Sequence, residues 1–466
     1  MLQLRMAFVR PKPALGTFSY RERMLHLLKG NLDFHGQRSL YGTHGWHSFP
    51  AKFPPQLPRS FITELTMPGD LVLDPMMGSG TTLIEAVLLG RIGMGSDIDP
   101  LARQMVATKL SPTRLHEAYT AGLRVMKGAR AALDQDEAGL REWLRERFDV
   151  PTQRFADYWF AQQTQLELAA LRREIERIED SLVRRFLSLA FSSIIITKSG
   201  GVSLAKDLAH TRPHRVVDKS PNSALEEFKK RVERNQDSLI PIEKTDFLVT
   251  AGDAQHLPFA SQSIDLIITS PPYASHAIDY MRAHKFSLIW CGHSISELAL
   301  LRRKYIGGDA VLQVPSLSMP PHASKVLSRL ESIDRQKARA LHRYYSEMKA
   351  VLSEMHRVLK SGRAAIVVVG TSQMRGLDTE THTCLGEIGE TVGFELIHIG
   401  TRRLDRDKRM MPARWNTDGT SQIEARMHEE YVIGSCKPEG PRPAVRSGGV
   451  VTFCAGCWLQ SQNHPR

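Results

Sequence analysis

The sequence predicts an α/β fold built on a doubly wound, mostly parallel sheet, and three junctions between strands and helices predict it. An apolar strand at Leu71–Asp74 ends in a glycine turn and is followed by a helical pattern over residues 81–89. A second strand over residues 92–97 ends in acids just before a helix, and a third runs through Ile264–Thr269. Short apolar strands that alternate with helices are typical of a parallel sheet covered on both faces.

Length and charge set the class of protein. The chain has 466 residues and a formal net charge of +12, with a sequence pI near 9.5. This length allows a large catalytic domain with an inserted module. The excess of basic residues suits a protein that contacts a phosphate backbone, although many proteins that never meet nucleic acid share it.

Compartment and metal content are predicted from what the sequence lacks. No apolar run reaches the ~18 residues of a membrane span, and Arg5 and Arg10 interrupt the N-terminal segment before a signal core forms. Five cysteines without a paired framework indicate a reducing compartment. We therefore expect a cytoplasmic protein without membrane contact. Cys454 and Cys457 have the spacing of half a zinc site, but no second pair accompanies them, so we expect free thiols and no metal.

The glycine turn after the first strand indicates a nucleotide-like cofactor. Residues 71–82 read Leu-Val-Leu-Asp-Pro-Met-Met-Gly-Ser-Gly-Thr-Thr. A phosphate-binding loop needs a lysine that is absent here, and the dinucleotide fingerprint needs a third glycine where Leu83 stands. A glycine turn preceded by an acid favours a cofactor with a cationic or hydroxylated group, and S-adenosylmethionine fits that description.

Two further carboxylates follow neighbouring strands. Asp97 ends the second strand and is placed to bind ribose hydroxyls, whereas Asp99 is expected to cap the helix that begins at Pro100. Asp253, in Thr-Ala-Gly-Asp-Ala-Gln, is expected to accept from the adenine amino group of a cofactor. For any one of them, a simple cap or turn role is the alternative interpretation.

Residues 269–273 read Thr-Ser-Pro-Pro-Tyr and follow the third strand directly. The two prolines carry no backbone N–H, so this loop offers carbonyl acceptors on a rigid edge. The amino nitrogen of cytosine or adenine is a poor nucleophile because its lone pair is delocalised into the ring. Acceptors on its hydrogens, for which Ser270 Oγ and the Pro271 carbonyl are suited, would localise that pair while Tyr273 stacks on the base. The alternative is an ordinary Pro-Pro loop after a strand.

Taken together, these segments resemble the DNA amino-methyltransferases, which methylate N4 of cytosine or N6 of adenine. The resemblance rests on His-Gly-Trp-His-Ser-Phe-Pro-Ala-Lys-Phe-Pro-Pro at residues 44–55, the glycine loop, Gly-Ser-Asp-Ile-Asp-Pro at 95–100, Gly-Asp-Ala at 252–254 and Thr-Ser-Pro-Pro-Tyr. It implies a class I methyltransferase-like sheet of seven strands with a largely helical insertion, S-adenosylmethionine as cofactor, and a base flipped out of double-stranded DNA. Serine at position 270 resembles the cytosine-N4 branch more than the adenine-N6 branch.

The resemblance also assigns roles to individual residues. The catalytic loop comprises Ser270, Pro271, Pro272 and Tyr273. The expected cofactor-binding residues are Phe49, Lys52, Phe53, Asp74, Pro75, Gly78, Gly80, Thr81, Thr82, Asp97, Asp253 and Ala254. Basic loops and the start of a helix after the catalytic loop supply the expected DNA contacts: Lys198, Lys206, Arg212, Arg215, Tyr280, Arg282, Arg402, Arg403, Arg406, Lys408 and Arg409. A catalytic base such as His276 or His284 is not required, because a methylated amino group loses its proton to water.

The chain divides into five expected segments. Residues 1–43 form a lead-in, 44–110 the first half of the catalytic domain, and 111–245 a helical insertion with a basic loop. Residues 246–437 form the second half, with a polar insertion at about 296–340, and 438–466 form a disordered tail. Within them we expect helices over residues 167–185, 186–197 and 344–359, and a helix that starts near 276.

Three other functions remain as alternatives. An RNA amino-methyltransferase usually has Asp, and a protein glutamine methyltransferase Asn, where Ser270 stands. The chain is also compatible with an inactive DNA-binding relative, although its loops are intact. A cognate restriction endonuclease is a possible partner.

Overall fold

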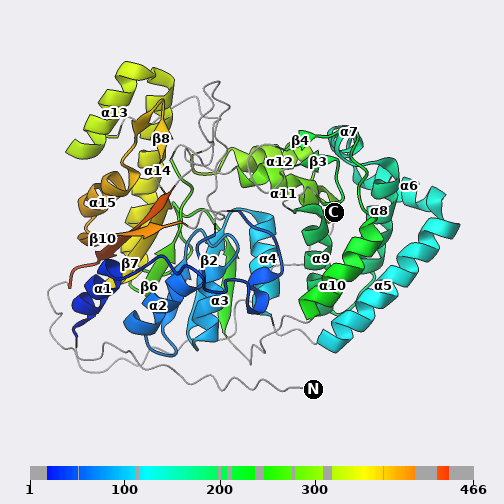
Figure 1. The fold of residues 1–466 in the computed structure, drawn as a ribbon, viewed down its shortest axis with the longest axis horizontal. Helices are drawn as coiled ribbons and strands as arrows, with labels where there is room; N and C mark the ends of the chain where they lie inside the picture. Colours follow the sequence, from blue (N-terminus) through cyan, green and yellow to red (C-terminus); the bar gives the residue numbers. More distant parts are fainter. Residues whose placement is uncertain are drawn as a thin grey trace.

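The computed structural model describes residues 18–50, 52–111, 115–197, 201–206, 213–236, 246–274, 279–307, 317–370, 372–404 and 428–439. A seven-stranded sheet in the order β10-β11-β7-β6-β1-β2-β5 forms its centre (Figure 1). Strand β11 runs opposite to the other six strands of this sheet, and the mostly parallel arrangement confirms the predicted fold class. The strands are β1 (Leu71–Asp74), β2 (Ile92–Asp97), β5 (Phe247–Ala251), β6 (Ile264–Thr269), β7 (Leu359–Gly370), β10 (Glu395–Arg403) and β11 (Glu429–Cys436).

The central strands are apolar because both of their faces are covered. In β6, Ile267 packs with α14 (Arg335–Val358) and α15 (Thr381–Thr391) on one face. Its neighbours Leu266 and Ile268 pack on the other face, which is covered by α1 (Tyr20–Lys29), α2 (Gln56–Leu65) and α3 (Thr81–Leu88). The chain order reverses between the adjacent parallel strands β1 and β6. Ligands of such sheets bind at this point, outside the carboxyl ends of the strands.

A helical module lies beside the sheet, next to α4 (Pro100–Leu110) (Figure 1). It contains α5 (Leu115–Gln135), α6 (Glu137–Arg147), α7 (Val150–Trp159), α8 (Gln162–Glu176), α9 (Ser181–Ile195), α10 (Ala224–Gln236) and the strand pair β3 (Ala205–Lys206) and β4 (His214–Arg215). Two helices from the second half join it, namely α11 (Tyr280–Leu288) and α12 (Ile295–Arg302). Their residues Phe286 and Leu298 share one core with Phe160 of the module. The helical region therefore draws on more of the chain than residues 111–245.

Several expected boundaries are wrong, and caps explain two of them. The helix expected over 167–185 is broken, because Asp180 accepts from the N–H groups of Leu182 and Val183 and starts α9 there. Asp334 caps α14 in the same way, so this helix begins at Arg335 rather than at residue 344. Strand β7 begins at Leu359, before the expected glycine stop, and α11 begins at Tyr280 rather than near residue 276.

The polar insertion at 296–340 is largely helical, since it holds α12, α13 (Pro321–Ile333) and the first turns of α14. The remaining elements are two short 3-10 turns, η1 (Gly42–Gly45) and η2 (Ile289–Cys291), and the strand pair β8 (Gln373–Met374) and β9 (Leu377–Asp378). Within the described ranges, no helix has the length and apolar character needed to cross a membrane. The described residues also contain no cluster of three or more side chains suited to a metal ion. Cys454, Cys457 and the tail after residue 439 lie outside them.

Candidate functional site

A hydrogen bond joins the ends of β1 and β6. The hydroxyl of Thr269 donates to Asp74 Oδ1 at 2.7 Å, and the N–H of Met76 donates to the same oxygen at 3.1 Å. Both partners are buried, and burial raises the pKa of the Asp74 carboxyl to about 7. Thr82, in the first turn of α3, donates from Oγ1 to the Ile268 carbonyl at 3.2 Å. The glycine loop and the Ser-Pro-Pro-Tyr loop therefore leave the sheet side by side.

Two positions in the glycine loop accept glycine alone. Gly78 and Gly80 have φ angles of 46° and 80°, in the left-handed region. A Cβ atom on Gly80 would lie 2.7 Å from a methyl group of Val106, and one on Gly78 would lie 3.0 Å from the ring of Phe49. Behind the loop, the buried Lys109 donates to the Ser79 carbonyl at 3.0 Å. Pro75 is buried, and Thr81 bonds Ser79 through its hydroxyl at 3.1 Å.

Asp97 connects the glycine loop to the end of β2. Its Oδ2 accepts from the N–H of Gly78 and its Oδ1 from the N–H of Asp99, both at 2.9 Å. Burial, assisted by the neighbouring Asp99, raises the pKa of Asp97 to about 6. Each carboxylate oxygen still has room for another donor. The arrangement suits a ligand with hydroxyl groups.

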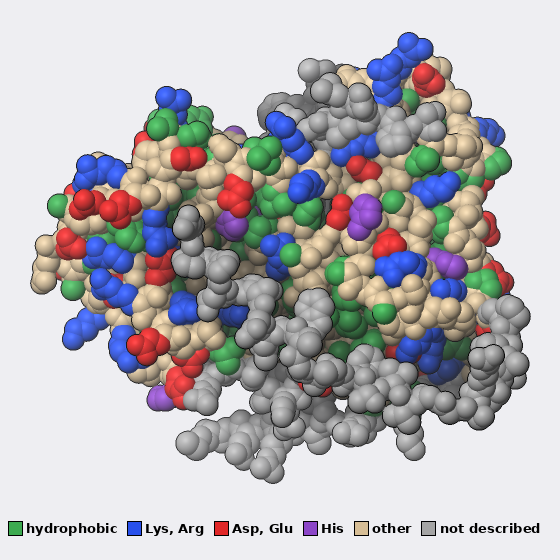
Figure 2. All heavy atoms as spheres, turned by 180° about the vertical axis from the view of Figure 1, so that it is seen from behind, with side chains coloured by type: hydrophobic (Ala, Val, Ile, Leu, Met, Phe, Trp, Pro, Cys, Tyr) green, Lys and Arg blue, Asp and Glu red, His purple; other side chains and the backbone are tan. Residues whose placement is uncertain are grey.

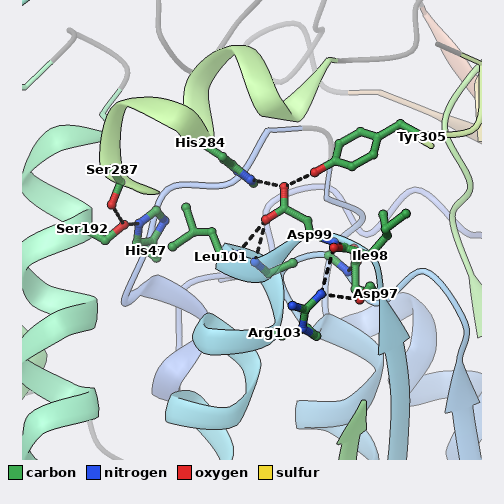
Figure 3. Close-up of polar contacts among 12 residues, drawn as sticks. His47, Asp97, Ile98, Asp99, Leu101, Arg103, Ser192, His284, Ser287 and Tyr305 are labelled. Carbon is green, nitrogen blue, oxygen red and sulfur yellow. Dashed lines mark hydrogen bonds and ion pairs between the residues drawn. The ribbon is translucent and has the colours of Figure 1, made fainter. Parts of the chain in front are cut away.

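Asp99 caps α4 as predicted, but it also has a second role that the sequence did not reveal. Its Oδ1 accepts from the first turn of α4, whereas Oδ2 accepts from His284 Nδ1 and from the Tyr305 hydroxyl, each at 2.7 Å (Figure 3). Burial opposes ionisation, but these donors, above all the His284 ring, hold the pKa of Asp99 at about 2. The carboxylate therefore fixes α11 and residue 305 over the end of β2.

The segment that precedes the sheet is attached at two points. Glu85 of α3 is fully buried and accepts from Tyr41 Oη at 2.6 Å, His44 Nε2 at 2.8 Å and Arg59 Nη1 at 2.8 Å. His47 forms the other attachment, because its Nε2 lies 2.9 Å from Ser192 Oγ on α9 (Figure 3). Nothing in the local sequence pattern indicated Glu85.

The charge state of His47 is set by burial, which lowers its pKa to about 3. Nδ1 lies 2.7 Å from the Ser48 carbonyl and must carry the proton, so Nε2 accepts from Ser192. Ser287 of α11 in turn donates to Ser192 at 2.8 Å. This chain of hydrogen bonds links the segment before the sheet, the helical module and α11.

The three predicted side chains of this segment lie in different surroundings. Phe49 stacks on Tyr280 with ring centroids 4.8 Å apart, beside Gly78. Lys52 donates to the His44 carbonyl at 2.9 Å, and burial lowers its pKa to about 8. Phe53, in contrast, packs in the hydrophobic core under the sheet with Leu57. Its position corrects the expectation that it lines the cofactor site.

The Ser-Pro-Pro-Tyr loop is fixed by its last residue. Tyr273 donates from its hydroxyl to Glu430 Oε1 on β11 at 2.9 Å. Burial, reinforced by Glu430, raises the pKa of Tyr273 well above its ordinary value, although a hydrogen bond from Ser270 opposes this shift. Ser270, Pro272 and Tyr273 are half-buried, whereas Pro271 is buried. The loop therefore presents a positioned hydroxyl and a tethered ring.

Asp253 and Ala254 follow β5 at the same edge of the sheet. Asp253 is half-buried and accepts from the N–H of Gln255 at 2.9 Å, whereas Ala254 is buried. The residues assigned to cofactor and base thus follow the carboxyl ends of four adjacent strands, β6, β1, β2 and β5.

The residues expected to contact DNA are scattered. Lys206 and Arg215 are exposed on β3 and β4, and the Arg215 guanidinium lies 4.8 Å from the centre of the Tyr158 ring. Arg403 is exposed at the end of β10. On the face shown in Figure 2, basic and acidic side chains of the described residues are interspersed. Lys198, Arg212, Arg406, Lys408 and Arg409, together with His276, lie outside the described residues.

One of these expected contacts is corrected, and two stay predictions although their side chains also have protein partners. Arg402 is 4 % exposed, donates to the Leu32 carbonyl at 3.1 Å and pairs with Glu430, so it faces the interior. Tyr280 stacks on Phe49 beside the glycine loop. Arg282 is paired with Asp279 at 2.9 Å.

Comparisons with known proteins find similar sequences among DNA-modifying enzymes. A family model described as DNA methylase matches residues 29–107. The type II methyltransferase M.MvaI of Kocuria varians is 25% identical over 416 residues, which cover 84% of this chain and 90% of that protein. M.AvaI of Anabaena variabilis, also a type II methyltransferase, is 24% identical over 401 residues, or 76% of this chain and 79% of that protein. Among solved structures, a TehB-like SAM-dependent methyltransferase from Corynebacterium glutamicum is 9% identical, covers 82% of this chain and 86% of its own, and has a TM-score of 0.26.

Proposed function

We propose that this chain, which belongs to the DNA amino-methyltransferase family, methylates the exocyclic amino group of a base in double-stranded DNA, more specifically N4 of cytosine. The observation that carries the proposal is the hydrogen bond between Thr269 and Asp74, which brings the starts of the Ser-Pro-Pro-Tyr loop and the glycine loop together. Ser270 supports the cytosine preference through its resemblance to that branch of the family.

S-adenosylmethionine is the cofactor of this family, and the residues present fit it. Gly78 has no side chain, which lets the Phe49 ring lie directly against the glycine loop, so two of the residues assigned to the cofactor are in contact. Asp97 retains acceptor positions for ribose hydroxyls, and Asp253 retains them for the adenine amino group. When bound, S-adenosylmethionine supplies an electrophilic methyl group on a positively charged sulfur.

The chain's own residues would position the base and the amino group. A stacked amino group cannot reach an enclosed site, so the base must be flipped out of the duplex. The Ser270 hydroxyl and the Pro271 carbonyl then hold the amino hydrogens, while the Tyr273 ring, tethered to Glu430, supports the face of the base. Catalysis in this scheme comes from positioning and charge complementarity, without a covalent bond to the enzyme.

The test compares methyl transfer with cofactor binding in Ser270→Ala. We expect incorporation of tritiated methyl into duplex DNA to fall about 100-fold or more, because the amino group loses an acceptor in the transition state. Affinity for S-adenosylhomocysteine, measured by calorimetry, should stay within several-fold. Ser361→Ala is a matched control, since its exposed hydroxyl contacts only Gln262 among the described residues. Equal loss of binding and transfer would contradict the role of Ser270.

The same assay separates the alternatives. Incorporation into structured RNA in preference to duplex DNA would favour an RNA amino-methyltransferase, and binding of DNA without binding of the cofactor would indicate an inactive DNA-binding relative. Digestion of the product to nucleosides distinguishes N4-methylcytosine from N6-methyladenine. We also propose that the modification protects DNA from a cognate restriction endonuclease, which cleavage of methylated and unmethylated genomic DNA would test.

A further inference from the structure

His284 is a buried side chain beside the site that the proposed mechanism does not use. Its ring is 1 % exposed, and Nδ1 lies 2.7 Å from Asp99 Oδ2. Since the ionised carboxylate accepts only, Nδ1 donates to it, and Nε2 is the ring nitrogen left for another partner. Among the residues that the structure describes, Nε2 is buried and has no hydrogen-bond partner. A buried polar atom without a partner is costly and calls for an explanation.

The surroundings of the ring place it at the cofactor end of the site. Its centroid lies 5.6 Å from that of Phe49 and 5.9 Å from that of Tyr280. Phe49 in turn lies against Gly78 of the glycine loop. Asp99, which orients the ring, follows Asp97 by two residues and donates its N–H to the Asp97 carboxylate (Figure 3). His284 is thus part of the wall between the glycine loop and the end of β2.

The base end of the site lies on the other side. Tyr273 is tethered to Glu430 on β11, and β7 separates β11 from β6 in the sheet. The order of the strands therefore puts β2 and its Asp99–His284 pair on one side of the Ser-Pro-Pro-Tyr loop and the Tyr273 tether on the other. This placement favours a cofactor contact over a role in accepting the proton of the methylated amino group.

We propose that Nε2 of His284 forms a hydrogen bond with a ribose hydroxyl of the bound cofactor, and that Asp99 and Tyr305 hold the ring in place for this contact. Ribose carries two hydroxyl donors, and the Asp97 carboxylate at the end of β2 binds one of them in the proposed function, on which this inference rests. His284 provides the polar partner of the second hydroxyl, contributed by a helix that follows the catalytic loop by only a few residues. It becomes a further cofactor-binding residue.

Two substitutions separate the roles of the two ring nitrogens. In His284→Asn, the amide nitrogen takes the place of Nδ1 and can still donate to Asp99, but no atom replaces Nε2. In His284→Gln, the longer amide reaches the position of Nε2 and loses the donor to Asp99. Calorimetry with S-adenosylhomocysteine on the full chain should show about 5- to 10-fold weaker binding for the Asn variant and partial recovery for the Gln variant. His293→Asn, just before the N-cap of α12, is the matched control and should bind as the wild type does.

Analogues of S-adenosylhomocysteine that lack the 2′- or the 3′-hydroxyl identify the ligand atom. The wild type should lose affinity for both, whereas the Asn variant should lose nothing further for the analogue that lacks the hydroxyl bound by His284. The inference would be overturned if the substitution His284→Asn lowered the affinity for S-adenosylhomocysteine and for both analogues by the same factor. It would also be overturned if the variant bound S-adenosylhomocysteine as the wild type does but had lost methyl transfer. Failure of the wild type to bind S-adenosylhomocysteine would instead overturn the proposed function. Thermal unfolding of each variant checks folding, and the Gln variant and the analogues keep the test decisive if the Asn variant is unstable.

Discussion

The Thr269 hydroxyl donates to the Asp74 carboxylate across 2.7 Å, between residues 195 positions apart in the chain. Both residues are buried at the ends of adjacent strands. Because each loop of the site begins at one of these residues, the bond fixes the distance between the proposed cofactor and base positions.

Thr269→Val should lower the free energy of unfolding by about 1–3 kcal/mol, because it removes the hydroxyl donor from a buried carboxyl group and leaves the Met76 N–H on the same oxygen. Urea unfolding measures this loss, and methyl transfer should fall with it as the two loops separate. Thr269→Ser keeps the hydroxyl and should retain most of the stability. A Val variant as stable and active as the wild type would show that the bond is dispensable.

The buried acids predict an unusual dependence of stability on pH. The pKa values of Asp74 and Asp97 are raised to about 7 and about 6 from an ordinary 3.8. The native state thus holds these protons to higher pH than the unfolded chain does, so their contribution to stability is complete below the unfolded pKa and is lost as pH rises through 6 and 7. As the pH rises from 5 to 8, the Asp74→Asn variant should therefore lose less stability than the wild type loses.

Thermal unfolding midpoints of the two proteins, taken across this range, provide the measurement. Asp218→Asn, at an exposed turn, is the control and should follow the wild type at every pH. Parallel curves for wild type and Asp74→Asn would mean that Asp74 does not titrate in this range.

Gly78→Ala tests whether the glycine loop is shaped for a ligand. The new methyl group would lie 3.0 Å from the Phe49 ring and displace it toward Tyr280. We expect at least about 10-fold weaker binding of S-adenosylhomocysteine, as well as a stability cost of about 1 kcal/mol for the left-handed backbone. Gly36→Ala carries a comparable strain at φ 71° with nothing within 4 Å of the new atom. Calorimetry on both variants separates the clash from the strain, and equal affinities would argue against the site.

Arg402 and Arg403 are adjacent in sequence but differ in burial, and this difference predicts different phenotypes. Arg402→Ala leaves Glu430 buried without its cation and should cost about 3–5 kcal/mol of stability. Arg403→Ala should leave stability within about 0.5 kcal/mol but weaken DNA binding and reduce its salt dependence, if this end of β10 faces the duplex. Urea unfolding and DNA titrations at two salt concentrations measure both effects. Loss of DNA affinity only in a folded Arg402→Ala variant would reverse the assignment.

Local signals in the sequence predicted the parts of the fold that are decided locally. The apolar strands, the glycine turn and the cap at Asp99 all lie within a few residues of the structure they produce, and each was found. The break between α8 and α9 was missed because the charged helical pattern runs across Asp180. Arg402 stands at the start of a basic stretch, and only the full length of β10 shows that it points inward.

The hydrogen bonds around the site could not be predicted from sequence patterns, because they join residues that are far apart in the chain. Glu85 meets His44 41 positions away, and Asp99 meets His284 and Tyr305 185 and 206 positions away. Such pairs have no period or spacing that marks them. Only the packing of α11 over the end of β2 brings them together.

The adjacency of β1 and β6 also constrains how the protein is made. At about 5–20 residues per second, a ribosome needs roughly 10–40 seconds to synthesise the 195 positions between Asp74 and Thr269. Throughout that interval β1 can pair only with β2, and its other edge stays unpaired because β6 has not yet been synthesised. The helices of the module emerge in the meantime and can pack among themselves. The site would therefore be one of the last features of the molecule to form, and a chain that stops before residue 264 would carry an open strand edge prone to association.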